Sequence, residues 1–325
     1  MLNQLPEVFA PHPPHILHTF YPLLKIYGNL QEDKNFTRLV EDVCRLVELN
    51  PVPWDNLPLE RDTIMHRCRH RSLLEVFIRT YELQCEKSRK KVWCCKSMET
   101  VYHLHHFERE GHRPFFIYLY RDGRDVAASF RNILIGDKHI YFLANKWKIE
   151  QELALLFLQK LPSGAFSIIR YEDFIKEPEK YIREICEKTG VAFDKSVLAY
   201  YKSPESRKTA LAGRMWENVS RPIIKNNTGK YHDRLTNEEV AIFEGEAGDM
   251  LLRLGYNNLG ETAEAVPQAG FSISELLAFE EENNRLKREA WKRATPEELA
   301  HLKPRQDFIK SLQTQMELLA TPDRL

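Results

Sequence analysis

An arginine and a serine eight residues apart form the stretch best suited to bind a phosphate group. Arg121 follows an apolar and aromatic run, residues 115–120, that predicts a buried parallel strand, and Asp122-Gly123 breaks this run. Residues from Arg124 onward favour a helix that carries Ser129. Ligands bind at the carboxyl ends of strands in open α/β sheets, so these groups could hold a phosphate. A surface pairing of Arg121 with Asp122 explains the turn equally well.

Residues 118–130, Tyr-Leu-Tyr-Arg-Asp-Gly-Arg-Asp-Val-Ala-Ala-Ser-Phe, resemble the 3′-phosphate-binding segment of the sulfotransferases. These enzymes use 3′-phosphoadenosine-5′-phosphosulfate (PAPS) as sulfuryl donor. The resemblance implies that Arg121 and Ser129 hold the 3′-phosphate of PAPS. It also implies transfer to an acceptor hydroxyl or amine, with 3′,5′-adenosine bisphosphate as the second product and no metal.

Two further stretches are similar to sulfotransferase motifs. Lys96 follows a short apolar run, residues 92–95, that predicts a buried strand. It matches the lysine of a Lys-Thr-His or Lys-Thr-Pro element. The resemblance implies that Lys96 stabilises charge on the bridging oxygen, while Met98 replaces the histidine of that element. Arg-Tyr-Glu-Asp at residues 170–173 implies that Tyr171 lies beside the adenine. A strand-end lysine and a packed tyrosine are the simpler alternatives.

His12 and His15 lie in a proline-rich, extended segment, residues 6–17. In several sulfotransferases a glutamate in a similar passage takes the proton of the acceptor. The resemblance therefore implies that one of these two histidines is the general base, and an imidazole titrates near neutral pH. Two surface histidines on a proline-rich turn are the alternative.

A late polar stretch, residues 224–231, resembles the Arg-Lys-Gly…Gly-Asp-Trp element that closes over the 3′-phosphate in the family. Aligning Gly229 places Lys225 on the basic position and makes Lys230 a second candidate. The stretch departs from the family pattern at Ile224, Asn226 and Tyr231.

The family's 5′-phosphosulfate loop, Pro-Lys/Arg-Ser-Gly-Thr-Thr, has no good match in the sequence, since Pro162-Ser163-Gly164 precedes a strand. We therefore expect an amino-terminally truncated sulfotransferase domain that begins within the helix after this loop. A second hypothesis is a non-catalytic protein that binds nucleotide or serves in assembly. A third is a P-loop kinase, against which the lack of a G-x-x-x-x-G-K-[ST] motif counts.

Periodicity and capping signals define the elements that would position these residues. Apolar stripes predict helices at residues 33–49 and 138–160, and residues 166–174 predict a further strand that ends in Tyr-Glu-Asp. Two pairs form potential capping boxes, Ser72 with Glu75 and Thr236 with Glu239. Residues 272–275 and 295–298 mark the starts of two further, charged helices. The overall prediction is an α/β, P-loop-like three-layer domain with a parallel sheet.

That domain is expected to span residues 1–258, followed by a linker at 259–271 and a helical extension at 272–325. The sparse apolar positions of the extension could pack on the domain or pair with a second subunit in a homo-oligomer.

Composition excludes several classes of protein. Basic and acidic residues number 47 each, so no overall field favours nucleic acid. No apolar stretch approaches the about 20 residues of a membrane span. The six cysteines and the histidines at 103, 105 and 106 lack metal-ligand or disulfide spacing. We therefore expect a cytoplasmic protein without a metal. Its acceptor, a small molecule, carbohydrate, lipid or peptide, is not specified by any motif.

Overall fold

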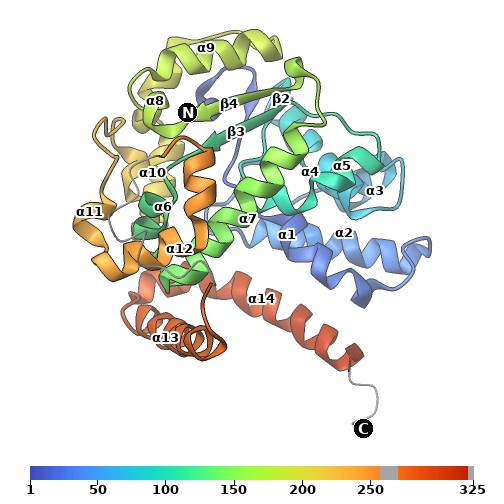
Figure 1. The fold of residues 1–325 in the computed structure, drawn as a ribbon. Coiled ribbons are helices and arrows are strands. Elements are labelled where there is room, and N and C mark those ends of the chain that lie inside the picture. Colours follow the sequence, from blue (N-terminus) through green and yellow to red (C-terminus); the bar gives the residue numbers. More distant parts are fainter. Residues whose placement is uncertain (257–269, 321–325) are drawn as a thin grey trace. The chain divides into compact units, whose positions relative to one another are not determined.

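The computed structural model describes residues 1–256 and 270–320. They form two compact units, each built from separate stretches of the chain (Figure 1). Unit 1 comprises Met1–Arg113, Arg183–Pro222 and Pro296–Leu325, and unit 2 comprises Pro114–Ile182 and Ile223–Thr295. Each unit combines helices with a two-stranded parallel sheet. The expected α/β class with parallel strands is confirmed, while the P-loop-like three-layer arrangement stays a prediction.

Unit 1 is organised around one hydrophobic core. Its sheet pairs β1 (Val8–Phe9) with β2 (Val92–Trp93). Its main helices are α2 (Asp33–Glu48), α4 (Leu73–Lys87) and α14 (Pro296–Ala320). The other elements, with η for 3₁₀ helices, are η1 (Leu2–Gln4), α1 (Ile16–Phe20), η2 (Tyr21–Tyr27), α3 (Arg61–Arg67), η3 (Met98–His103), α5 (Leu104–Arg109), η5 (Lys195–Lys202), α10 (Pro204–Leu211) and η6 (Arg214–Ser220).

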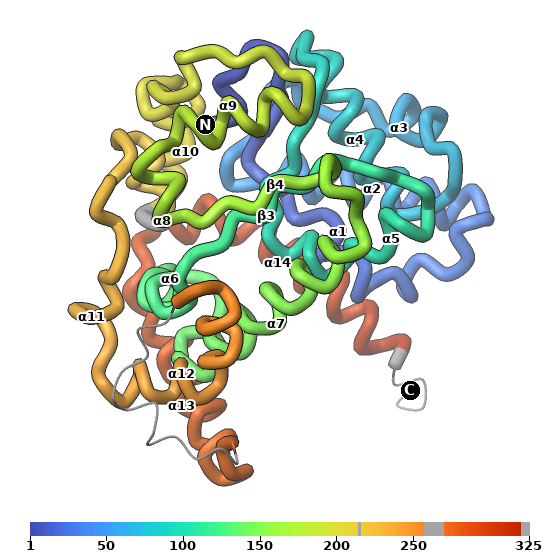
Figure 2. Tube along the Cα trace, turned by 45° about the horizontal axis from the view of Figure 1, so that its top comes forward, coloured from blue at the N-terminus to red at the C-terminus, as the bar shows by residue number. Residues whose placement is uncertain are grey.

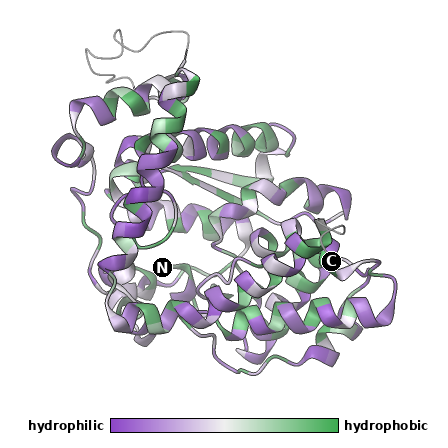
Figure 3. Cartoon of the chain, turned by 90° about the horizontal axis from the view of Figure 1, so that it is seen from below, coloured by the Kyte–Doolittle hydropathy of each residue, from purple (hydrophilic) through white to green (hydrophobic). Residues whose placement is uncertain are grey.

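Helix α2 illustrates why this core forms. Phe36, Leu39, Val40, Val43 and Val47 recur at helical spacing and are all buried. Figure 3 shows the resulting mixture of hydrophilic and hydrophobic residues along the helices, as expected when one side of a helix is buried. The helix predicted at residues 33–49 is therefore confirmed.

In unit 2, β3 (Phe116–Tyr120) pairs in parallel with β4 (Phe166–Arg170), and the two strands run side by side in Figures 1 and 2. Helix α6 (Gly123–Phe130) follows β3, and it packs with α7 (Ile140–Leu158) and α12 (Asn237–Arg253) in a second hydrophobic core. The remaining elements are η4 (Ser163–Ala165), α8 (Tyr171–Phe174), α11 (Tyr231–Arg234) and α13 (Ile273–Lys292), together with α9 (Pro178–Thr189), which begins in this unit.

Two strand predictions are corrected by the structure. The strand predicted over residues 166–174 ends at Arg170, where α8 begins. The prediction that the run before Arg121 is buried is wrong. Leu119 of β3 is 52% exposed and Ile168 of β4 is 49% exposed. Within the described residues β3 pairs along one edge only. An apolar side chain on a strand with one neighbour keeps contact with water, so local hydrophobicity overestimates the burial. The same holds for Val92 of β2, which is 38% exposed.

The two helices of the carboxyl-terminal extension pack in different units. Phe308 and Leu312 of α14 belong to the core of unit 1. In unit 2, Oδ1 of Asn283 on α13 accepts hydrogen bonds from the backbone N–H groups of Lys138 (2.8 Å) and His139 (3.0 Å) before α7. The predicted linker at 259–271 lies almost entirely outside the described residues. The domain boundaries and the homo-oligomer stay predictions.

The described residues show neither a membrane-spanning helix nor a metal cluster. Among them, no helix is both long enough and apolar enough to cross a bilayer. Over the same ranges, no three His, Cys, Asp or Glu side chains form a group that could hold a metal ion. His103 and His106 instead stack on the ring of Tyr21, with ring centroids 4.6 and 3.8 Å away.

Candidate functional site

Arg121 lies directly after β3 and one residue before Asp122, the N-cap of α6. The Asp122 carboxylate accepts a hydrogen bond from the Arg124 backbone (2.9 Å), which starts the helix at the predicted place. The guanidinium of Arg121 lies over the ring of Tyr171, 4.7 Å from its centroid. Its Nε is buried and has no hydrogen-bond partner among the described residues, so it is a donor that an anion could use.

Asp125 anchors this arrangement, and no motif in the sequence identifies it. Its carboxylate is fully buried and accepts hydrogen bonds from the backbone N–H groups of Gly229 (2.9 Å) and Tyr231 (3.0 Å). Nη2 of Arg121 lies 3.2 Å from the same carboxylate. From sequence, an acid in the first turn of α6 indicates only a favourable interaction with the helix dipole. In the structure it ties the loop before α11 to α6.

Asn227 connects that loop to both strand ends of unit 2. Its carbonyl oxygen accepts a hydrogen bond from Nη2 of Arg121 (2.8 Å). Its side-chain amide donates to the hydroxyl of Tyr171 (2.8 Å). Unit 2 therefore brings Arg121 and Tyr171 together, and Asn227 is a further residue of this group.

The other predicted phosphate ligands lie in the same unit. Ser129 is exposed and lies one helical turn beyond Asp125, on the same side of α6. Lys225 is exposed, and Lys230 is half-buried at the N-cap of α11. The loop that carries both lysines contacts Arg121 through Asn227.

A hollow of about 310 Å³ lies beside this group in unit 2. Its lining includes Arg124, Arg170, Thr228 and His232. Arg124 is not available to a ligand, because its buried guanidinium pairs with Asp122 (2.8 Å) and with Glu244 (2.7 Å). Burial favours the neutral form of Arg124. The hydrogen bonds to these two carboxylates outweigh this effect and raise the pKa of its guanidinium above the ordinary value. Arg124 therefore stabilises the fold around the site.

In unit 1, His15 is held by a carboxylate. His15 is the N-cap residue of α1 and adopts the left-handed conformation (φ 56°, ψ 40°). Its Nδ1 lies 2.8 Å from Oγ of Ser97 and 3.0 Å from Oε2 of Glu99. A carboxylate only accepts hydrogen bonds, so this contact favours the tautomer of the neutral ring that carries its proton on Nδ1 and leaves the lone pair on Nε2. This orientation suits a general base.

His12 has the opposite arrangement. The side-chain amide of Asn50 lies 3.2 Å from Nδ1 of His12 and also donates to the carbonyl oxygens of His12 and Val52. Because this amide nitrogen only donates, Nδ1 accepts and the neutral ring carries its proton on Nε2. Burial, with smaller contributions from the charges of Lys96 and His15, lowers the pKa of His12 to about 3. His12 is therefore a neutral hydrogen-bond donor at pH 7.

Lys96 lies within electrostatic reach of His12. Its side chain retains access to solvent. Partial desolvation by the surrounding protein still lowers the pKa of its ammonium group, and the Glu205 carboxylate partly offsets this shift. Unit 1 therefore brings the three predicted catalytic residues, His12, His15 and Lys96, into one neighbourhood.

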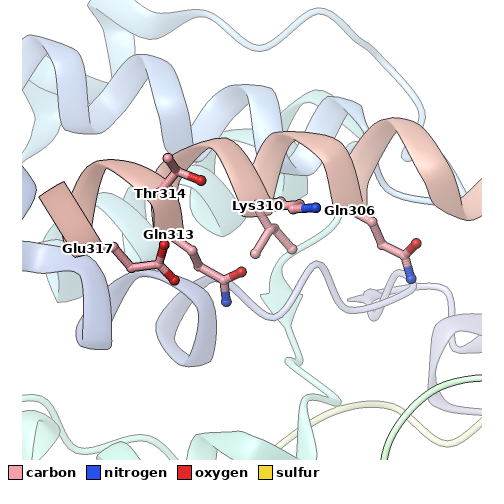
Figure 4. Close-up of a pocket in the computed structure, with 6 residues that line it drawn as sticks. Gln306, Lys310, Gln313, Thr314 and Glu317 are labelled. Carbon is pink, nitrogen blue, oxygen red and sulfur yellow. The ribbon is translucent and has the colours of Figure 1, made fainter. Parts of the chain in front are cut away.

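A second hollow, of about 400 Å³, lies along α14 and does not form a comparable site. Figure 4 labels Gln306, Lys310, Gln313, Thr314 and Glu317, which all come from this one helix. Binding sites typically surround a ligand with side chains from several sides. Side chains from the surface of one helix do not converge in this way.

Comparison with known proteins decides the family. A family model described as the Sulfotransferase family matches residues 1–195, more than half of the 325 residues. The chain belongs to the sulfotransferase family. The match includes six of the eight predicted site residues of this family member, whereas Lys225 and Lys230 lie beyond it. No curated protein matched the chain.

Proposed function

We propose that the chain transfers a sulfuryl group from PAPS to a hydroxyl or amine of an acceptor. The observation that carries this proposal is the position of Arg121 in a member of the sulfotransferase family. Its guanidinium follows a parallel strand, lies over Tyr171 and has a buried Nε without a partner among the described residues. That unused donor fits an anionic group of the nucleotide.

The residues of unit 2 would bind the nucleotide. Arg121 and Ser129 donate hydrogen bonds to the 3′-phosphate, and Lys225 and Lys230 add positive charge from the loop fixed by Asp125. Tyr171 packs beside the adenine. Bound PAPS supplies an activated sulfuryl group, and the protein contributes positioning and charge stabilisation, as in phosphoryl transfer.

The residues of unit 1 would manage the proton and the leaving group. Nε2 of His15 accepts the proton of the acceptor, and Glu99 stabilises the resulting imidazolium through Nδ1. The acceptor oxygen or nitrogen bonds to sulfur as the bond from sulfur to the bridging oxygen breaks. Lys96 stabilises the negative charge left on that oxygen. His12 donates a hydrogen bond and does not act as the base.

Isothermal titration calorimetry with 3′,5′-adenosine bisphosphate tests the nucleotide site. The Arg121→Ala variant should bind about 10- to 150-fold more weakly, because a hydrogen bond to a charged group contributes roughly 1.5–3 kcal/mol. Arg131→Ala is the matched control: Arg131 caps the carboxyl end of the same helix and pairs with Glu239. Equal affinities of the two variants, or no binding by the unmutated chain, would refute the proposal.

A transfer assay separates the two remaining hypotheses. PAPS is incubated with phenols, sugars, amines and peptides, and the sulfated product is measured by mass spectrometry. Product that disappears in His15→Asn but not in His66→Asn supports catalysis by His15, since His66 is exposed elsewhere in unit 1. Bisphosphate binding without transfer to any acceptor would favour a non-catalytic nucleotide-binding protein. Competition by ATP alone would favour a kinase.

A further inference from the structure

A side chain beyond the family match contacts the loop of the proposed base. Nη2 of Arg305, on α14, donates a hydrogen bond to the carbonyl oxygen of Pro14 at 2.9 Å. Pro14 is buried and directly precedes His15. Phe308 follows Arg305 by three residues, hence on the same side of α14, and belongs to the core of unit 1. The helix is thus fixed with Arg305 against the His15 loop.

Arg305 is held in an unfavourable environment for a cation. Burial lowers the pKa of its guanidinium to about 10, and the negative charge of Glu99 opposes this shift. Its Nε is buried without a partner among the described residues. A partly buried guanidinium whose Nε has no hydrogen-bond partner costs stability, so its position needs a compensating role.

The charged groups around His15 come from several elements. Glu99 of η3 lies 3.0 Å from its Nδ1. Arg305 of α14 acts electrostatically on both Glu99 and His12. Lys96 and His15 also act on His12. Glu99 is therefore the carboxylate that His15 and Arg305 share.

We propose that Arg305 is a positioning residue that fixes the backbone and ring orientation of His15. A left-handed conformation costs a non-glycine residue roughly 1 kcal/mol or more and persists only where the surroundings impose it. Two contacts impose it here: Arg305 holds the carbonyl just before His15, and Ser97 with Glu99 holds its ring. The inference rests on the proposed function in that His15 is the base.

Nitrogen-15 NMR of the imidazole rings tests this role without nucleotide or acceptor. In the full chain at pH 7.5, His15 should be the tautomer with the proton on Nδ1. Arg305→Gln should reduce the ratio of this tautomer to the other by about 10-fold or more, and Arg305→Lys should restore part of it. Arg38→Gln is the matched control, because Arg38 also donates to a backbone carbonyl, that of Ile26, and contacts Gln315 on α14. The same His15 spectrum in Arg305→Gln and Arg38→Gln would overturn the proposal.

A measurement on the unmutated chain covers the case in which Arg305→Gln does not fold. The guanidinium protons of Arg305 should give separate, slowly exchanging signals with nuclear Overhauser contacts to Pro14. A single averaged signal without such contacts would overturn the proposal. A His15 tautomer that depends on Arg305 in a chain that binds no bisphosphate would support the positioning role and refute sulfuryl transfer. Bisphosphate binding with an unaffected tautomer would support the nucleotide site and refute the positioning role.

Discussion

Arg121 and Tyr171 emerge side by side because the strands that precede them pair in parallel register. Tyr120, the last residue of β3, lies opposite Arg170, the last residue of β4. The next residue of each strand therefore leaves the sheet at the same end. The guanidinium of Arg121 then lies 4.7 Å from the ring centroid of Tyr171. Register alone thus assembles the centre of the proposed nucleotide site.

The Tyr171→Phe substitution distinguishes the contribution of the Tyr171 hydroxyl to nucleotide binding from that of its ring. It removes the hydrogen bond from Asn227 (2.8 Å) but keeps the surface on which Arg121 lies. We expect calorimetry to show roughly 2- to 12-fold weaker binding of 3′,5′-adenosine bisphosphate. Tyr171→Leu also removes the cation–π contact, which contributes about 0.5–2 kcal/mol, and should weaken binding further. Tyr181→Phe, on α9, should leave the affinity unchanged, and equal affinities of both Tyr171 variants would contradict a role of the ring.

Close packing at Gly123 predicts a difference between two Gly→Ala variants. A Cβ at Gly123, the first residue of α6, would lie 2.5 Å from the ring of Phe243 and 2.6 Å from that of Trp147. Gly123→Ala should therefore lower the free energy of unfolding by about 1–3 kcal/mol. A Cβ at Gly248, within α12, meets no atom within 4 Å. Gly248→Ala should raise the free energy of unfolding by about 0.5–1 kcal/mol. Urea unfolding measures both, and effects of the same sign would contradict the packing described.

The carboxyl-terminal helix should be essential to the stability of unit 1. Phe308 is 5% exposed and lies in the core of that unit, whereas Leu318 on the same helix is 64% exposed. Phe308→Ala should cost about 3–5 kcal/mol of unfolding free energy. Leu318→Ala should change it by less than about 0.5 kcal/mol. A small effect of Phe308→Ala in urea unfolding would indicate that α14 is not part of the core.

Local patterns are sufficient to predict many elements. The strand, turn and helix around Arg121 form as predicted, and both Thr236 with Glu239 and Ser272 with Glu275 make complete capping boxes. The side chain of Ser72 caps α4, but Glu75 does not complete the box. Its carboxylate instead accepts a hydrogen bond from the backbone N–H of Arg69 and pairs with the guanidinium of Arg79. A buried arginine one turn away competes for that carboxylate, and a four-residue pattern does not include it.

Long-range contacts explain what the sequence does not reveal about the site. Asp125 and its amide partners Gly229 and Tyr231 are more than 100 positions apart in the sequence. Arg305 and Pro14 are separated by 291 positions. Neither contact has a periodic or capping signal, because each depends on how distant elements pack. The choice between His12 and His15 likewise depends on whether a donor or an acceptor faces Nδ1, which residue type alone does not determine.

Buried neutral histidines should make the protein sensitive to acid. Burial, with smaller contributions from the charges of His18 and His105, lowers the pKa of His103 to about 4, whereas an unfolded histidine titrates near 6.5. Between these values the unfolded chain binds more protons, so the stability from neutral His103 is complete above pH 6.5 and is lost as pH falls toward 4. One such group contributes a slope of up to about 1.4 kcal/mol per pH unit to the free energy of unfolding.

Urea unfolding at pH 7, 6 and 5 should therefore show a shallower pH dependence for His103→Phe, which keeps a ring against Tyr21. His66→Phe, at an exposed position, should retain the original slope. Identical slopes for the two variants would show that His103 does not titrate in this window.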